Sequence, residues 1–577
     1  MFNEFKKWLG AYWHWLILIL ISTLFFVGTS GFNYFTQSGG FTKWLSPDES
    51  ANYNFTKLYA QTGRLTIFEK YNLVAEDIIH PRSYRSDSGF IKPVSFLGII
   101  LIYGQIAALT TYKIIPFLTP LFAALGIIFF YLLVKEIFDR RNALICALLL
   151  AVFPPYIYYS ARSMFHNVLF MVLVLAGFYY ALIAIRRTQS KKLEPEQGRL
   201  SVFFSYLPNL YIALSGALFG LAIIIRTSEL LWLLPILLIL WLGNFKKVGF
   251  IKLILFISFL FLALMQAFYY NQILYQSFWR GGYNEMNNSI LQIAHAGTNI
   301  FKTRAATIQT SLQAVKNNIF YFGLNPQKSL KMLYYYFARM FYWLFWPAAV
   351  GFLLWLFRIK EWQKRHYFYL ITYLIASAIL IIYYGSWDFH DNPDPKSFTI
   401  GNSYVRYWLP VYLGAMPFAA LLLINLAKLL RKKVLINVFL VLVMAGVWFI
   451  SLKFVLFTGD EALIKSARNM QAWRGEQKQI LDLTESRAVI ITQYHDKLLF
   501  PERKVIVGLF TDPNMNKDYA TLVKYLPVYY YNFTFREQDI NFLNQSRLAT
   551  VGLRIDQVAK ITKDFTLYKL SYAEVKQ

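Results

Sequence analysis

Long apolar runs, separated by short polar connections, dominate the first four fifths of the chain. Runs of about 17–25 apolar residues, the length that crosses a bilayer as a helix, recur twelve times before residue 460. We therefore expect an α-helical polytopic membrane domain over residues 1–459. The runs lie near 11–28, 91–110, 114–134, 143–159, 166–185, 207–225, 229–243, 248–270, 333–357, 367–384, 403–427 and 434–457.

The remaining segment, 460–577, has a different pattern. It is charged and holds short strand-like runs at Arg487–Gln493 and Lys504–Leu509, with turn residues between the runs. We expect a soluble α/β domain, in which His495 and Asp496 would be surface turn residues.

Composition supports a membrane protein. The 577 residues are 57% hydrophobic and only 15% charged, and the mean hydropathy is +0.40, whereas soluble domains are about 25% charged. This excludes a disordered chain and an ordinary soluble enzyme. The single cysteine, Cys146, excludes a disulfide framework and a cysteine-rich metal site.

The net charge of +27 is explained by topology, so we expect no nucleic-acid partner. Strict alternation of twelve spans places five basic connections opposite the basic N-terminus. If the run 91–110, with its Pro93, Gly98 and Gly104, is a juxtamembrane or re-entrant helix, about eleven spans remain. The N-terminus and all five connections then face the cytoplasm. The connections are 135–142, 186–199, 244–252, 358–366 and 428–433.

The extracytoplasmic face then receives an outer loop at 29–113, a second long loop at 271–332 and the C-terminal domain. Long loops gathered on one face are typical of a functional surface, since connections are normally short. The predicted location is the cell membrane, with several passes, a cytoplasmic N-terminus and extracytoplasmic catalytic loops.

The first outer loop carries an acidic pair. Ser46-Pro47-Asp48-Glu49 begins an amphipathic helix, and Ser46 with Glu49 fits a capping box. A structural role in the capping box explains why Glu49 stands at this position but does not require Asp48. A carboxylate pair just above the bilayer can also act as a general base.

The same loop ends in a cationic stretch with His80, Arg82, Arg85 and Lys92. Such side chains can place their apolar stems along the lipid and their charged ends among the headgroups. They can also bind phosphate through charge-assisted hydrogen bonds.

Two further cations stand at outer span ends. Arg226 follows an apolar run and has Glu229 as a possible ion partner, whereas Arg406 opposes the positive-inside bias. An aromatic belt would account for Tyr407 beside it. Carboxylates, cations at membrane depth and many aromatics together suit an enzyme whose donor is a sugar linked to a polyprenyl phosphate lipid.

Motifs spread over nearly the whole chain then carry a family resemblance. The sequence resembles the GT-C integral membrane glycosyltransferases, in the branch that holds protein O-mannosyltransferases and the lipid A aminoarabinose transferase. The matching motifs are Pro47-Asp48-Glu49, Lys92-Pro93, Phe138-Asp139-Arg140-Arg141-Asn142-Ala143, the segment from Pro154-Pro155 to Arg162, Arg226 and Arg406-Tyr407 with Pro410.

The resemblance implies a GT-C fold with two juxtamembrane helices in the first outer loop, and an inverting transfer at the outer face of the membrane. It implies that Asp48 is the catalytic base and that Glu49 orients it or helps to bind a metal. The resemblance makes 271–332 a lid over the donor. The implied donor phosphate site consists of Lys92, Arg226, Arg406 and Tyr407, and further candidates for substrate binding are Arg82, Arg85, Arg162 and His166.

Two departures from the family pattern concern a metal. Some relatives have an acidic residue where this chain has Asn167, and Ile91 stands where the aminoarabinose transferase has a glutamate. We therefore assign no metal ligands and no certain cofactor, and a divalent cation stays open.

Two other classes of protein use lipid-linked sugars. An O-antigen ligase or polymerase centres on a large outer loop with Arg and His rather than on an early Asp-Glu pair. A transporter of lipid-linked sugars would place charges within spans and show internal repeats. The expected partners are a polyprenyl phosphate-linked sugar donor, membrane lipids and an acceptor of unknown identity, which could be protein, lipid or glycan.

Overall fold

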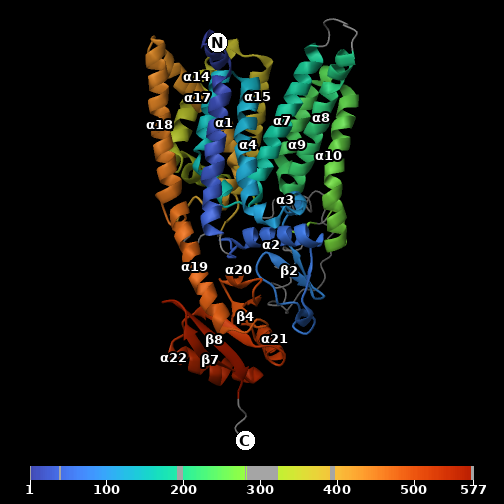
Figure 1. Ribbon diagram of the computed structural model, residues 1–577, viewed down its shortest axis with the longest axis vertical. Coiled ribbons are helices and arrows are strands. Elements are labelled where there is room, and N and C mark those ends of the chain that lie inside the picture. Colours follow the sequence, from blue (N-terminus) through green and yellow to red (C-terminus); the bar gives the residue numbers. More distant parts are fainter. Residues whose placement is uncertain are drawn as a thin grey trace. The chain divides into compact units, whose positions relative to one another are not determined.

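A computed structural model of the chain describes residues 2–37, 40–190, 199–279, 281–282, 323–389, 391 and 397–573. It divides into two units, drawn in Figure 1. The helical unit comprises Met1–Asn33, Pro116–Ala267 and Thr298–Lys465. The loop-sheet unit comprises Tyr34–Ile115, Phe268–Gly297 and Ser466–Gln577.

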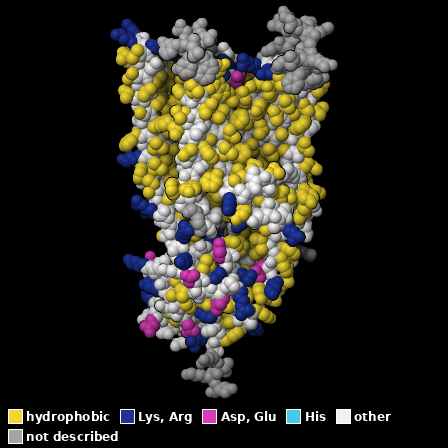
Figure 2. Space-filling model, viewed as in Figure 1, with side chains coloured by type: hydrophobic (Ala, Val, Ile, Leu, Met, Phe, Trp, Pro, Cys, Tyr) yellow, Lys and Arg dark blue, Asp and Glu magenta, His cyan; other side chains and the backbone are white. Residues whose placement is uncertain are grey.

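The helical unit consists of long apolar helices. Among the described residues, eight helices are long and apolar enough to cross a membrane, and Figure 2 shows hydrophobic side chains over their visible faces. The chain is therefore a multi-pass membrane protein. The eight are α1 (Phe2–Thr36), α4 (Ile115–Ile137), α7 (His166–Ser190), α8 (Arg199–Ile225), α10 (Phe245–Tyr275), α15 (Lys364–Gly385), α17 (Leu409–Lys428) and α18 (Lys433–Phe457).

Two bent pairs of helices also pass the same test of length and apolarity, each as a broken span or a re-entrant loop. The helices α5 (Arg140–Ala151) and α6 (Pro154–Ala161) meet at 52°, because Pro154 and Pro155 lack the N–H groups that would continue α5. The second pair is bent by 103°, where Phe341 leaves the helical conformation. It joins α13 (Pro326–Leu333) and a π-helical turn, η4 (Tyr334–Arg339), to α14 (Tyr342–Leu356).

Ten of the eleven predicted spans coincide with these helices and pairs. The eleventh, 229–243, is the 14-residue helix α9 (Leu230–Gly243), about 21 Å long, which is shorter than the ~30 Å hydrocarbon core. The run 91–110 does not form a span. Its helix, α3 (Gly98–Leu109), has 12 residues and belongs to the loop-sheet unit.

Four of the five basic connections meet at one end of the helical unit, as alternation requires. Arg186 forms an ion pair with Glu136 at 2.9 Å, and Arg365 donates to the Glu136 carbonyl at 2.7 Å. Lys364 donates to the carbonyl of Gly243 at 2.6 Å. Lys252 donates to Thr188 at 3.1 Å. The side of the membrane that this end faces stays a prediction.

The first outer loop folds around a small antiparallel sheet. The sheet has the order β1-β3-β2, with β1 (Ile67–Phe68), β2 (Tyr84–Asp87) and β3 (Phe90–Pro93). Beside it, α2 (Pro47–Thr62) packs on α3. A Cβ at Gly104 would lie only 2.4 Å from the Tyr59 ring, so the glycine allows the two helices to approach closely. The two helices are those that the family resemblance implies.

The C-terminal segment forms the predicted α/β domain around a five-stranded sheet of order β5-β4-β6-β8-β7. The two strand-like runs become β4 (Val489–Thr492) and β5 (Lys504–Val507), which are parallel. The other elements are α19 (Leu463–Leu483), α20 (Asp496–Leu499), α21 (Pro513–Val523), β6 (Val528–Phe533), α22 (Glu537–Phe542), β7 (Leu553–Lys560) and β8 (Phe565–Tyr572).

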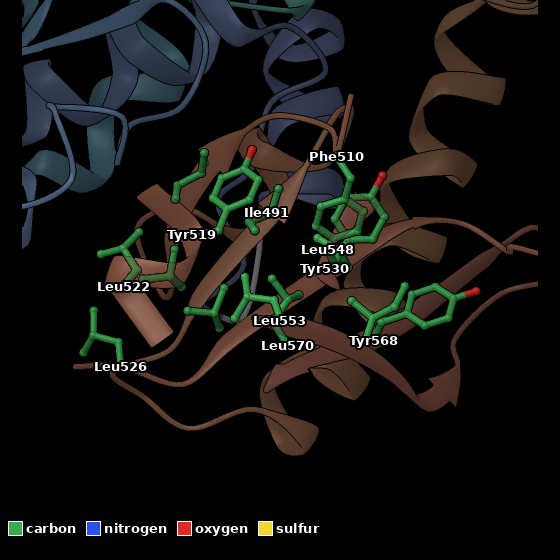
Figure 3. Close-up of a cluster of buried hydrophobic side chains, with 14 of the residues drawn as sticks. Ile491, Phe510, Tyr519, Leu522, Leu526, Tyr530, Leu548, Leu553, Tyr568 and Leu570 are labelled. Carbon is green, nitrogen blue, oxygen red and sulfur yellow. The ribbon is translucent and has the colours of Figure 1, made fainter. Parts of the chain in front are cut away.

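Alternation along the strands produces two cores, one on each face of this sheet. Val489 and Ile491 point into one cluster, whereas Ile490 points into the other. Figure 3 shows the first cluster, with Tyr530 and Tyr568 among its buried rings. Burial on both faces explains why β4 reads as a continuous apolar run.

The first outer loop completes this core. Ala75 and Ile79 are buried in the same cluster as the sheet residues, and His80 pairs with Ile506 in a parallel bridge. Lys504 forms an ion pair with Glu69. The predicted boundary at 460 therefore separates stretches of sequence, while the loop and the C-terminal domain fold as one unit.

Candidate functional site

Asp48 lies in the first turn of α2, where the local sequence fixes the backbone. The Ser46 N–H donates to Glu49 Oε2 at 2.9 Å, and the Asp48 N–H donates to Ser46 Oγ at 3.3 Å. The capping box is thus formed. Glu49 is buried and serves the cap, while the Asp48 carboxylate stays half-exposed.

Ser83 approaches this carboxylate from the turn before β2. Its Oγ donates to Asp48 Oδ1 at 2.6 Å. Ser83 has φ of +64°, a left-handed conformation that is uncommon for residues with a side chain. Strained backbone of this kind clusters at functional sites. The turn therefore holds a hydroxyl donor against the predicted base.

Arg82 turns away from that carboxylate and binds the C-terminal domain. Its backbone N–H and side chain donate three hydrogen bonds to Asp496, at 2.9, 3.1 and 2.6 Å. Asp496 is fully buried and His495 nearly so, so the expectation that these two are surface turn residues is wrong. Burial also lowers the pKa of His80, which leaves that ring neutral rather than cationic.

Arg85 and Lys92 face each other across the β2–β3 ladder, in direct register. Lys92 is buried and donates to Asp87 at 3.1 Å and to the Leu274 carbonyl at 3.0 Å. The Lys92 ammonium is thus already paired with a carboxylate. The register places two cationic side chains opposite one another on the ladder, where charge-assisted hydrogen bonds to a phosphate are possible.

In the helical unit, Arg226 stands just past the end of α8 in a buried polar network. Its Nε donates to Glu229 Oε1 at 2.9 Å, and its Nη2 donates to the Tyr384 hydroxyl at 3.1 Å. Glu229 also accepts from Tyr384 at 2.7 Å and from the Trp232 indole at 2.5 Å. The suspected ion partner of Arg226 is therefore confirmed, and it holds the guanidinium in one orientation.

Two aromatic rings link Arg226 to the other predicted arginines. The Tyr407 ring lies 4.5 Å from the Arg226 guanidinium and 5.3 Å from that of Arg406. The Phe165 ring lies 4.6 Å from Arg406 and 5.1 Å from Arg162. We call these five residues the arginine cluster.

Burial differs across this cluster. Arg162 and Arg226 are 7% and 5% exposed, whereas Arg406 and Tyr407, in the short helix α16 (Ser403–Tyr407), are half-exposed. The cluster thus gathers three guanidinium groups, of which that of Arg226 is paired with Glu229. Its half-exposed side, at Arg406 and Tyr407, can receive an anion through charge-assisted hydrogen bonds.

The chain is similar to known proteins in part of its sequence and in its fold. Residues 101–196 match the family described as dolichyl-phosphate-mannose-protein mannosyltransferase. No curated protein sequence matches the chain. Among solved structures, the fold is similar to ArnT from Cupriavidus metallidurans bound to undecaprenyl phosphate, with a TM-score of 0.52 and 12% identity, covering 96% of this chain and 98% of that one.

Two structures of the oligosaccharyltransferase from Archaeoglobus fulgidus are also similar. The apo form has a TM-score of 0.51 and 14% identity, covering 94% of this chain and 72% of that one. The complex of AglB with an inhibitory peptide and a dolichol-phosphate has a TM-score of 0.51 and 12% identity, covering 99% and 75%. The chain has the GT-C glycosyltransferase fold. The predicted fold class is confirmed, and so, with the family match, is the predicted class of enzyme, a glycosyltransferase.

The GT-C fold here shows no metal centre among the residues that the structure describes, since no group of three or more His, Cys, Asp or Glu side chains is close enough to hold an ion. Asn167 donates to the Arg406 carbonyl at 3.2 Å, and His166 is buried as the first residue of α7. Most of the predicted lid, 271–332, lies outside the described residues.

The structure adds site residues that the sequence did not single out. Ser83 carries no local signal, because its role depends on a turn that meets α2 from 35 positions away. Tyr384 and Phe165 are two of 108 Phe, Trp and Tyr residues within a chain that is 19% aromatic. Only their position beside an arginine distinguishes them.

Proposed function

We propose that this GT-C protein is an inverting glycosyltransferase that moves a sugar from a polyprenyl phosphate lipid to an acceptor at the outer face of the membrane. The fold and the family match support the transfer reaction. Solved structures of the same fold are complexes with undecaprenyl phosphate and with a dolichol-phosphate, which supports a lipid phosphate donor. The positive-inside rule supports a cytoplasmic N-terminus and an outer site.

The observation that carries the proposal is the arginine cluster. Departure of the donor phosphate places negative charge on a phosphate oxygen in the transition state, and fixed cations stabilise that charge most effectively where water is excluded. Arg226 is held by Glu229 and Tyr384, so it needs no reorganisation. Arg406, half-exposed beside it, contacts the incoming phosphate.

The β2–β3 pair of Arg85 and Lys92 is the second phosphate-binding element of the proposal. They stand opposite one another in direct register, and Lys92 keeps its ammonium group fixed through the Leu274 carbonyl. Arg82 has a different part. Its bonds to Asp496 keep the turn that carries Ser83 in place.

Asp48 is the proposed base. As the acceptor oxygen forms a bond to the anomeric carbon, its proton passes to the Asp48 carboxylate, and the bond from that carbon to the phosphate oxygen breaks with its electron pair on phosphate. The configuration inverts because there is one displacement. Ser83 orients the carboxylate through its hydrogen bond to Oδ1, and the capping box built by Glu49 fixes the start of α2.

The test uses the purified full-length protein with a panel of polyprenyl phosphate hexoses and pentoses. Release of polyprenyl phosphate is followed by mass spectrometry in the presence of membrane extract as acceptor. Asp48→Asn should lower turnover by about 10²–10⁴-fold, the usual worth of a general base, while retaining bound polyprenyl phosphate. Arg406→Gln should mainly weaken donor binding.

Glu76→Gln is the matched control. Glu76 is an exposed acid of the same loop, so its loss changes the net charge equally without reaching the proposed base. Near-wild-type turnover of folded Asp48→Asn would reject Asp48 as the base. Failure of the wild-type protein to release polyprenyl phosphate from any donor would reject the lipid phosphate donor.

A further inference from the structure

A large cavity lies inside the helical unit, apart from the arginine cluster. It is lined by α4, α7, α9, α15 and the starts of α10 and α17, and its volume is about 730 Å³. That volume is typical of sites for small ligands. The cavity is elongated along the helices. On α7 its lining runs from Met171 to Arg186, and on α15 from Gln363 to Ala376, so it is about 20 Å long.

The lining changes from cationic to apolar along this length. Its rim contains five cations from α4, α7, α10 and α15, together with one carboxylate, Glu136, which is paired with Arg186. Lys364 and Arg365 donate to neutral carbonyls, so the lining residues leave a net formal charge of about +4 at the rim. The five cations are Lys135, Arg186, Lys247, Lys364 and Arg365.

The inner part of the cavity is built almost wholly from aliphatic and aromatic side chains. Water gains few hydrogen bonds there, so an apolar chain is the favoured occupant. A length of about 20 Å is somewhat more than one leaflet of a hydrocarbon core that is ~30 Å thick. The cavity thus matches an amphiphile with a single inserted chain and an anionic head at the rim.

We propose that this cavity binds an anionic phospholipid, with one acyl chain between the helices and the phosphate among the rim cations. Charge complementarity decides for this occupant, because a zwitterionic or neutral lipid leaves the rim uncompensated. The rim is formed by basic connections that are predicted to face the cytoplasm, where anionic lipids attract basic segments and bind in basic pockets between transmembrane helices.

An occupant of this cavity would also meet the network behind the arginine cluster. Trp232 lines the cavity, and its indole N–H donates to Glu229, which in turn holds Arg226. The lipid would therefore pack against the residue that supports the buried arginine. The lipid proposal does not depend on the identity of the sugar donor.

The experiment titrates delipidated full-length protein with phosphatidylglycerol or with phosphatidylcholine of the same acyl chains, and counts bound lipid by native mass spectrometry. Phosphatidylglycerol should bind at least tenfold more tightly. A rim variant, Lys247→Gln/Lys364→Gln/Arg365→Gln, should lose about fivefold in affinity for each cation, which corresponds to about 1 kcal/mol per Lys or Arg.

A matched control removes three cations that do not line the cavity. Arg431→Gln/Lys432→Gln/Lys433→Gln changes exposed residues just before and at the start of α18, and its phosphatidylglycerol affinity should equal that of the wild type. If this control weakens binding as much as the rim variant does, or if the two lipids bind equally, the anionic site is rejected.

A second pair of variants tests the apolar part of the site. Ala376→Trp and Leu240→Trp each fill the cavity from a different helix, and the variant that keeps the wild-type melting temperature is used. It should lose phosphatidylglycerol binding. Wild-type binding by that variant would overturn the proposal, as would the selective loss of bound polyprenyl phosphate, since the cavity would then hold the tail of the donor lipid.

Discussion

Substituting Arg82 should destabilise the loop-sheet unit more than substituting its partner Asp496. The Asp496 side chain is 0% exposed, whereas that of Arg82 is 37% exposed. Arg82→Met removes the two side-chain hydrogen bonds to the carboxylate and leaves a buried charge with only a backbone donor from residue 82. Breaking a buried pair in this way costs about 3–5 kcal/mol.

The reciprocal change should be milder. Asp496→Asn keeps the shape of the side chain, and the Arg82 guanidinium can be hydrated because it is partly exposed. We expect a loss of about 1–2 kcal/mol. The double variant Arg82→Met/Asp496→Leu should recover part of the loss, since neither side chain then leaves a buried charge.

Hydrogen exchange of the purified full-length protein measures this locally. Amides of β4 that exchange through opening of the C-terminal core should exchange about 100-fold faster or more in Arg82→Met, because 1.4 kcal/mol corresponds to a factor of ten. The effect of Asp496→Asn should be clearly smaller. If Asp496→Asn opens the core more than Arg82→Met does, the reasoning from desolvation is wrong. Arg82→Met should also slow transfer, because the Ser83 turn loses its anchor.

Two other predictions concern pH and helix packing. Burial lowers the pKa of His495 to about 4, from an ordinary value of 6.5. Below pH 6.5 the unfolded chain therefore binds a proton that the folded domain does not. The free energy of unfolding should fall by up to about 3 kcal/mol as the pH drops from 6.5 to 4. The urea-unfolding midpoint, measured against pH for the wild type and for His495→Gln, should depend less on pH in the variant. An equal pH dependence in the two proteins would contradict the assignment to His495. In the helical unit, a Cβ at Gly351 would lie 2.0 Å from the Phe418 carbonyl oxygen, so Gly351→Ala should cost about 1–3 kcal/mol and lower the melting temperature. Gly446→Ala, with open space around its Cβ, is the control and should not lower it; equal effects would show that the α14–α17 contact is not tight.

The membrane spans could be predicted because their signal is local. Length and apolarity mark each helix without knowledge of its neighbours, and charge alternation then identified 91–110 as the run that does not cross. The strands β4 and β5 were also visible as short apolar runs. The α2 capping box was visible as well, because its residues lie three positions apart.

Contacts between distant parts of the sequence could not be predicted in this way. Asp496 looked like a surface turn residue because its partner, Arg82, stands more than 400 positions earlier. The same distance hid the contribution of Ile79 to the C-terminal core. For Arg226, by contrast, the partner Glu229 lies three residues away and was suspected from the sequence.

The shared core of the loop-sheet unit has a consequence for biosynthesis. Ala75 and Ile79 leave the ribosome about 400 residues before the strands that bury them. At a synthesis rate of roughly 5–20 residues per second, the apolar patch of the first loop stays uncovered for about 20–80 s. The spans between this loop and β4 are inserted during that time. The nascent protein therefore needs protection at that loop throughout synthesis. Chains that stop before β4 should expose this patch permanently, so they would be substrates for quality-control proteases even when every span is in place.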